Sequence, residues 1–285
     1  MLTSLTTLAN VFATHPLTRE APLSAWGRFA SWQIRSRIQD EVIVPWIAGQ
    51  KLAVRRGMLG ATGNIYLGLN EFADMMFPLH FLREGDLFLD IGANVGSYSV
   101  LAAGVCRARS WAFEPDPLTA GHLRRNIAIN ALEDRVVVHE CALGPSSGEV
   151  KFTIGLDTVN KVADDGAANA RVVQQRRLDD VVGAAEPLMI KMDVEGYEED
   201  VLRGAQAVLA KPCLKVIELE TVTPGIEAMM RENQFERFYY DPFRRALGSS
   251  PNAYKAENTL FIRDRPFVEA RLASAKTVDV LGRAI

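Results

Sequence analysis

The sequence contains few of the features that mark secreted, membrane or nucleic-acid-binding proteins. It has only three cysteines, Cys106, Cys141 and Cys213, which are far apart and form no CxxC or Cys/His spacing. We therefore expect them to be small buried apolar residues in a reducing compartment. The formal net charge of -3 offers no marked basic excess. Because phosphate-binding domains usually carry such an excess, we expect no nucleic-acid partner.

Long apolar runs are also missing. No run approaches the length that spans a bilayer, so we expect no transmembrane segment. Segment 1–13 carries spaced apolar residues but lacks the basic start and the long apolar centre of a signal peptide. We therefore expect a cytoplasmic protein. The apolar face of a first helix in this segment is a candidate dimer contact, so a homodimer is one expectation for the oligomeric state.

The dinucleotide-binding fingerprint G-x-G-x-x-G is absent from the glycine-rich stretch FLDIGANVGSYS. Counted from Gly92, the second and third glycine positions hold Asn94 and Ser97. The pattern present is Asp90-x-Gly92-x-Asn94-x-Gly96. Such a turn after an apolar strand aims backbone N–H groups at a ligand but has no pyrophosphate cradle. We therefore expect a nucleotide-type ligand that carries no pyrophosphate.

From Asp86 onward, apolar strands alternate with amphipathic helices, which is typical of a parallel sheet with helices on both faces. The expected strands cover 87–91, 110–114, 136–140, 187–193, 213–220 and 258–264. The expected helices cover 95–106, 118–129 and 197–209. Two added antiparallel strands are expected at 148–154 and 171–175, on either side of a loop over 155–169.

Residues 1–82 do not repeat this alternation. We expect them to form an N-terminal cap of helices and a strand pair on a main domain of residues 83–285, with an acceptor-side or oligomerisation role. The expected cap helices cover 2–12, 23–38 and 71–82, and the expected strands cover 41–49 and 51–56.

A second acid supports a nucleoside site. Glu114 ends the strand after the one that carries Asp90, where nucleotide-binding α/β folds place a carboxylate on ribose hydroxyls. One carboxylate can accept hydrogen bonds from both vicinal hydroxyls. Alone, Glu114 could equally be a strand-end acid that faces water. Together with the glycine turn, it accounts for both ends of one nucleoside.

Seven segments in order resemble the FkbM-type family of S-adenosylmethionine-dependent methyltransferases. The segments are FLDIGANVGSYSV, AFEPDP, NIAIN, CALG, RRLDDVV, IKMDVEGYEEDVLRGA and VIELE. The resemblance as a whole covers about residues 70–263. The resemblance implies a class I methyltransferase fold, which is α/β and Rossmann-like, with a mostly parallel seven-stranded sheet and helices on both faces. It also implies S-adenosylmethionine as the methyl donor and transfer to a hydroxyl of a sugar or a polyketide-type natural product.

The resemblance assigns seven residues to the donor. The turn residues would hold its methionine end, Glu114 its ribose, and the end of the third strand its adenine. These residues are Asp90, Gly92, Asn94, Gly96, Glu114, Cys141 and Ala142.

Methyl transfer to a hydroxyl requires removal of the acceptor proton, so a base or a metal is expected. Asp193 ends the strand at the edge where doubly wound sheets bind ligands, and with Glu195 it is the candidate acid/base. Lys191 is a catalytic candidate or a buried strand lysine that pairs with a carboxylate. Asp193, Glu195 and Glu218 could form a Mg²⁺ site, but their spacing gives no dedicated ligand motif, so metal is not favoured.

Four further residues are candidates for contact with the acceptor. Glu218 lies at the end of the next strand, where an unpaired buried acid would be costly. Thr158 and Asn160 lie in the expected loop, and loops around a rigid sheet often bind ligands, although a connecting role is equally open. His80 precedes the first strand, but a structural role is the commoner one for a histidine.

The sequence therefore predicts an S-adenosylmethionine-dependent O-methyltransferase for a small hydroxylated acceptor such as a sugar, a glycoside or a polyketide-type metabolite. An NAD(P)-dependent oxidoreductase on a similar fold is the alternative, which the missing fingerprint disfavours. A nucleic-acid methyltransferase is disfavoured by the charge and by MDVEG, where base-modifying enzymes carry Asn/Asp-Pro-Pro-aromatic. A donor-binding protein without turnover stays open.

Overall fold

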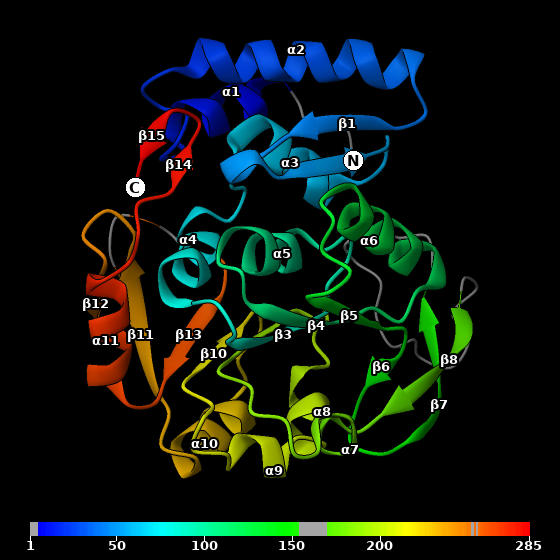
Figure 1. The fold of residues 1–285 in the computed structure, drawn as a ribbon, viewed down its shortest axis with the longest axis vertical. Helices are drawn as coiled ribbons and strands as arrows, with labels where there is room; N and C mark the ends of the chain where they lie inside the picture. The colour runs from blue at the N-terminus through cyan, green and yellow to red at the C-terminus, as the bar shows by residue number, and fades with distance from the viewer. Residues whose placement is uncertain (1–4, 154–169, 252–253, 255) are drawn as a thin grey trace.

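The computed structural model describes residues 5–153, 170–251, 254 and 256–285. An eight-stranded sheet lies at its centre with helices on both sides, and most of the N-terminal elements gather at one end (Figure 1). The predicted α/β class is therefore confirmed. None of the helices in the described part of the chain combines the length and the apolarity needed to cross a bilayer.

The order of the central sheet is β12-β11-β13-β10-β9-β3-β4-β5. Its five parallel strands are β3 (Leu87–Ile91), β4 (Arg109–Phe113), β5 (Val136–His139), β9 (Met189–Met192) and β10 (Val216–Leu219). Strand β13 (Thr259–Ile262) runs antiparallel to both β10 and β11 (Glu236–Asp241). Strand β12 (Ala246–Gly248) pairs with β11 and adds an eighth strand to the seven that were expected.

Each face of the sheet is covered by its own helices, because side chains alternate along the buried strands. One face packs against α4 (Phe72–Phe81), α5 (Ser97–Val100), the π-helical η2 (Leu101–Val105), α6 (Pro117–Ile129) and α11 (Arg265–Ala273). The other packs against α7 (Leu178–Val182), α8 (Glu198–Arg203), α9 (Gln206–Leu209) and α10 (Pro224–Glu232). All six predicted strands of the main sheet are confirmed within a few residues.

The helix expected over 197–209 is divided into α8 and α9 at Gly204. A Cβ at this position would lie 2.1 Å from the carbonyl oxygen of Gly144, so the two backbones approach too closely for a side chain.

The antiparallel pair is confirmed as β7 (Gly148–Thr153) and β8 (Ala170–Arg176), and β6 (Ala142–Leu143) completes this small sheet. The loop expected over 155–169 lies outside the described residues.

The N-terminal elements are α1 (Leu5–Thr14), α2 (Pro22–Ile38), β1 (Val42–Pro45), η1 (Ile47–Gly49), β2 (Lys51–Val54) and α3 (Leu59–Leu67). The predicted strand pair is confirmed, whereas α3 had not been expected. The last short strands, β14 (Asp279–Val280) and β15 (Arg283–Ala284), lie beside these elements (Figure 1). Asn126 ties β2 to α6, since its Oδ1 accepts a hydrogen bond from Ala53 N at 2.7 Å.

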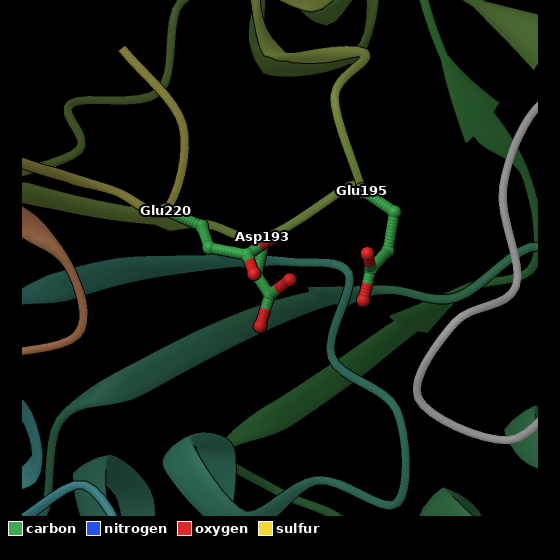
Figure 2. Close-up of side chains that lie close together, drawn as sticks. All are labelled: Asp193, Glu195 and Glu220. Carbon is green, nitrogen blue, oxygen red and sulfur yellow. The ribbon is translucent and has the colours of Figure 1, made fainter.

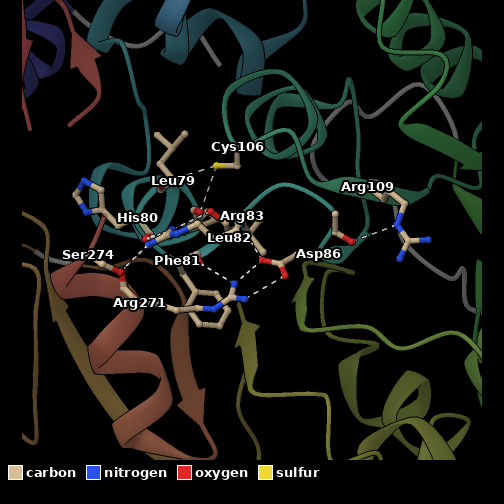
Figure 3. A network of polar contacts seen from close by, with 12 residues as sticks. Leu79, His80, Phe81, Leu82, Arg83, Asp86, Cys106, Arg109, Arg271 and Ser274 are labelled. Carbon is tan, nitrogen blue, oxygen red and sulfur yellow. Dashed lines mark hydrogen bonds and ion pairs between the residues drawn. The ribbon is translucent and has the colours of Figure 1, made fainter. Parts of the chain in front are cut away.

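A polar network fastens the end of α4 to α11 (Figure 3). The Asp86 carboxylate accepts hydrogen bonds from the Arg271 guanidinium and, at 2.7 Å, from the backbone N–H of Arg83. The Arg83 guanidinium donates to the carbonyl oxygens of His80 and Leu82 at 2.7 and 2.9 Å. The network therefore pairs the polar groups at the end of a helix that is buried along its length.

Replacing Asp86 with asparagine is expected to lower the free energy of unfolding by about 2 kcal/mol, because a half-buried guanidinium loses its charged partner. Urea denaturation would measure this. The matched control is Glu84→Gln, which breaks an exposed ion pair with Arg107 and should change stability very little. Equal losses for the two variants would contradict the role given to the network.

Candidate functional site

A cavity of about 420 Å³ opens at the carboxyl ends of β3, β4 and β9, and we call it the main cavity. Its position agrees with the rule that ligands of doubly wound sheets bind beyond the carboxyl ends of the strands. Its size suits a small molecule. Residues Leu59, Gly60 and Asn64 of α3 also line it, so the N-terminal elements contribute to its wall.

The turn after β3 forms one wall of the main cavity. Gly92 has a φ of 76°, and a Cβ there would lie 1.8 Å from the carbonyl oxygen of Asp193. Asn94 also has a positive φ, 50°, and its Oδ1 accepts a hydrogen bond from Val95 N at 2.7 Å. The glycine at position 92 is therefore required by close contact with the end of β9, and the asparagine by its own left-handed backbone.

Glu114 lies at the edge of the main cavity with a carboxylate that is already oriented. Its Oε2 accepts a hydrogen bond from Asn94 N at 3.0 Å, and its Oε1 accepts one from Asp116 N at 2.9 Å. Burial raises the pKa of Glu114 to about 7. Each oxygen keeps a second lone pair. The carboxylate can therefore accept further hydrogen bonds from a vicinal diol while the backbone holds it in place.

Three ionisable side chains lie in a row across neighbouring strands. Asp90 is opposite Lys191 in the β3–β9 pair, and Lys191 is opposite Glu218 in the β9–β10 pair. All three are almost fully buried. Burial raises the pKa of Asp90, whose Oδ2 accepts a 2.6 Å hydrogen bond from Ser99 Oγ. The three side chains share one face of the sheet, so the lysine cation lies between two acids.

Lys191 forms an ion pair with Asp193, with 2.8 Å between Nζ and Oδ2. Burial alone would lower the pKa of Lys191, but the neighbouring carboxylates, led by Asp193, outweigh it and raise the pKa. Burial likewise acts to raise the pKa of Asp193, but Lys191 outweighs it and lowers that pKa. The pair is therefore ionised, with the lysine charge fixed against the carboxylate.

Asp193, Glu195 and Glu220 bring three carboxylates together in the main cavity (Figure 2). One oxygen of each lies within 4.8 Å of the others, which is close enough for one divalent cation. Burial, followed by hydrogen bonding and charge repulsion from Asp193, raises the pKa of Glu220 to about 8. Glu220 takes the place that the sequence assigned to Glu218, because Glu218 lies inside β10 whereas Glu220 lies just beyond its end.

Most of the predicted site residues line the main cavity. They are Asp90, Gly92, Asn94, Glu114, Cys141, Ala142, Lys191, Asp193 and Glu195. Gly96 is not among the described lining residues. It caps α5 with a φ of 87°, and its N–H donates to Ala93 O at 2.8 Å. Cys141 is a buried free thiol, whereas the free thiols of Cys106 and Cys213 are partly exposed.

The candidate acceptor residues are scattered. Among the described residues, Glu218 lines a neighbouring cavity and not the main one. His80 is fully buried, lines neither cavity, and has its Nδ1 2.5 Å from the Tyr240 hydroxyl. Burial lowers the pKa of His80 to about 4, so it packs as a neutral core side chain. Thr158 and Asn160 lie outside the described residues.

Several lining residues were not found from the sequence. Tyr98 donates a 2.6 Å hydrogen bond to Glu71 Oε2, and its hydroxyl lies 3.4 Å from Glu218 Oε1. Asn64 donates to Ser97 Oγ at 3.2 Å. Glu71 and Asn64 lie in a region without a motif, so only tertiary packing could place them here. Tyr98 is in the glycine-rich stretch. Its position in the helix that follows Gly96 was the one signal in the sequence that could have placed it at the site.

One protein-family model and several curated proteins are similar to parts of this chain. The model described as "Methyltransferase FkbM domain" matches residues 90–244. The hexuronic acid methyltransferase AglP of Haloferax volcanii is 27% identical over 140 residues, which are 48% of this chain and 57% of that protein. The methyltransferase sdnD of Sordaria araneosa is 26% identical over an alignment of 205 positions that covers 58% of this chain and 79% of that protein.

Among solved structures, the crystal structure of methyltransferase FkbM from Methylobacillus flagellatus is 18% identical, with a TM-score of 0.43. The match covers 65% of this chain and 48% of that one. This chain thus spans little more than half of the archaeal relative and about half of the solved structure.

Proposed function

The chain belongs to the FkbM methyltransferase family, and on that basis we propose that it transfers a methyl group from S-adenosylmethionine to a hydroxyl of a small acceptor. The proposed acceptors are a sugar, a glycoside or a polyketide-type metabolite. The archaeal relative named as a hexuronic acid methyltransferase supports the sugar class. The observation that carries the proposal is the joint placement of the Gly92 turn and Glu114 on the wall of one cavity.

The residues of the main cavity suit this donor. Glu114 would hold the ribose diol, and the turn from Asp90 to Asn94 would hold the methionine end. Seven carboxyl side chains of the lining, against one lysine, favour a positively charged ligand; they are Glu71, Asp90, Glu114, Asp193, Glu195, Glu220 and Glu257. When bound, the donor supplies an electrophilic methyl group on a sulfonium.

The proposed general base is one of the carboxylates just beyond the ends of β9 and β10. The acceptor hydroxyl would bind beside Asp193 and Glu220, and its proton would move to a carboxylate oxygen of this pair as the oxygen attacks. Lys191 fixes the orientation of Asp193 through their ion pair. The alignment of the hydroxyl and the exclusion of water then depend on the surrounding cavity wall.

The rate of turnover, kcat, is expected to rise with pH through about 8. Below that value Asp193 and Glu220 hold one proton between them, because the pKa of Glu220 is raised to about 8, and above it both can accept a proton. In Glu220→Gln the rise near pH 8 should disappear, since the raised pKa belongs to the replaced group. Initial rates from pH 6 to 10 would show this, and an unchanged profile in the variant would exclude Glu220 from the titration.

Replacing Asp193 with asparagine should lower kcat by roughly 100-fold, because a positioned base contributes about that much. The affinity for S-adenosylhomocysteine, measured by calorimetry, should change by no more than about twofold. Asp200→Asn is the matched control, since Asp200 pairs with Arg203 on α8 and is not among the described lining residues. Equal losses of turnover and donor affinity in Asp193→Asn would remove its proposed role as a base.

We expect no metal requirement, because Lys191 already forms an ion pair with Asp193, one of the three carboxylates that could bind a cation. Dialysis against EDTA is therefore expected to leave kcat unchanged. A loss of turnover that Mg²⁺ restores would instead assign the carboxylates of Asp193, Glu195 and Glu220 to a metal.

A further inference from the structure

A second cavity of about 260 Å³ adjoins the main cavity, and we call it the side cavity. It lies between the first turns of α4 and the strands β10, β11 and β13. Glu257 and Asn258 line both cavities, so the two are neighbours across this short segment. The backbone N–H of Glu257 donates a 2.8 Å hydrogen bond to Asp74 Oδ2, which fixes the segment to α4.

Two buried polar atoms of the side-cavity lining have no hydrogen-bond partner in the described part of the chain. They are Oε2 of Glu218, a residue that is 1% exposed, and Oδ1 of Asn258, a residue that is 8% exposed. A buried polar atom without a partner costs about 1–3 kcal/mol, so two atoms on one wall indicate groups that a ligand completes.

Glu218 presents a carboxyl oxygen without a described partner to this cavity. Burial and the carboxylates of Asp74 and Glu71 raise its pKa well above the usual range, although Lys191 acts in the opposite direction. Its Oε1 lies 3.4 Å from the Tyr98 hydroxyl, so Oε2 is the oxygen left without a partner among the described residues. A carboxyl oxygen accepts a hydrogen bond and, when protonated, also donates one, and the Asn258 carbonyl oxygen accepts. A ligand hydroxyl can satisfy either group.

Aromatic side chains form part of the remaining wall, which also carries Asp74, Arg237 and Glu257. Phe77, Phe238 and Tyr240 line the side cavity, and the rings of Phe77 and Tyr240 pack edge to face with centroids 5.1 Å apart. A carbohydrate ring has C–H faces that pack on aromatic side chains and hydroxyls at its edge. A purely apolar acceptor would leave Glu218 and Asn258 unpaired, which makes it a poorer fit.

We propose that the side cavity binds a carbohydrate ring of the acceptor, with Glu218 and Asn258 as hydrogen-bonding partners of its hydroxyls. This inference rests on the proposed function, because the hydroxyl to be methylated must reach Asp193 and Glu220 from the side cavity across the segment of Glu257 and Asn258. The ring would thus lie beside the donor and not in its site. Asp74 is a positioning residue, since it holds this segment in place.

The test is saturation-transfer NMR on the full chain loaded with S-adenosylhomocysteine. The probes are the methyl glycosides of glucose, galactose, rhamnose and glucuronic acid, with catechol as a non-carbohydrate hydroxyl compound. At least one glycoside should bind. Glu218→Met and Asn258→Leu should each weaken its binding by about tenfold, whereas Glu218→Gln, which keeps a donor and an acceptor, should stay within about threefold.

Donor affinity provides the control for folding and for the site. S-adenosylhomocysteine should bind equally well to the two Glu218 variants, since Glu218 is not among the described lining residues of the main cavity. Glu232→Gln, at an exposed position of α10, should leave both affinities unchanged. The inference would be overturned if catechol bound and no glycoside did. It would also be overturned if Glu218→Met and Asn258→Leu bound the glycoside as tightly as the unaltered chain does. If S-adenosylhomocysteine did not bind the unaltered chain, the proposed function would be refuted. Titration of the ligand-free chain with a glycoside would then still test the side cavity.

Discussion

Replacing Glu114 with alanine is expected to weaken the binding of S-adenosylhomocysteine by about 100-fold. The variant would lose a carboxylate that can accept from both ribose hydroxyls, and each hydrogen bond to a charged group is worth about 1.5–3 kcal/mol. It would also leave the N–H groups of Asn94 and Asp116 without their acceptor, which loosens the turn that forms the other end of the site. Isothermal titration calorimetry measures the affinity directly.

The matched control for this prediction is Glu140→Ala. Glu140 follows the neighbouring strand β5, pairs with Arg124 at the surface and is not among the described lining residues. Its loss should leave donor affinity within about twofold, as for other exposed ion pairs. If Glu114→Ala bound the ligand as tightly as this control, the carboxylate would not contact the ribose.

Replacing Gly92 with alanine is expected to lower the free energy of unfolding by about 3 kcal/mol or more and to abolish donor binding. The new Cβ would lie 1.8 Å from the carbonyl oxygen of Asp193, so the backbone of the turn or of the end of β9 must move. Urea denaturation and calorimetry with S-adenosylhomocysteine would measure the two effects.

Gly85→Ala separates the steric clash from backbone strain. Gly85 precedes β3 as Gly92 follows it, its φ of 86° is similar, and no atom lies within 4 Å of the Cβ position. It should lose only about 1 kcal/mol and should keep its donor affinity. Similar results for Gly85→Ala and Gly92→Ala would show that contact with Asp193 does not determine the turn.

The sequence predicted well those helices and strands whose bounds are set by their own residues, through the spacing of apolar side chains and through capping. Strand β3 is found with the predicted bounds, since five successive buried residues end in a glycine turn. Helix α6 also starts near its predicted position, because Asp116 and Pro117 cap it. Periodicity and capping are local properties, so a single sequence is sufficient to show them.

The remaining features depend on contacts that no local pattern records. Gly96 belongs to the motif but shapes the turn from outside the described cavity wall, and motif matching cannot make that distinction. The exchange of Glu218 for Glu220 in the carboxylate cluster depends on where β10 ends, to within one residue. Asn258 reaches the side cavity only because β13 returns antiparallel beside β10.

The most direct test of a donor site between Gly92 and Glu114 is a calorimetric titration of the unaltered chain with S-adenosylhomocysteine and, separately, with NAD⁺. We predict that S-adenosylhomocysteine binds with one-to-one stoichiometry and that NAD⁺ gives no binding heat. No heat with S-adenosylhomocysteine, or tighter binding of NAD⁺, would contradict the assignment.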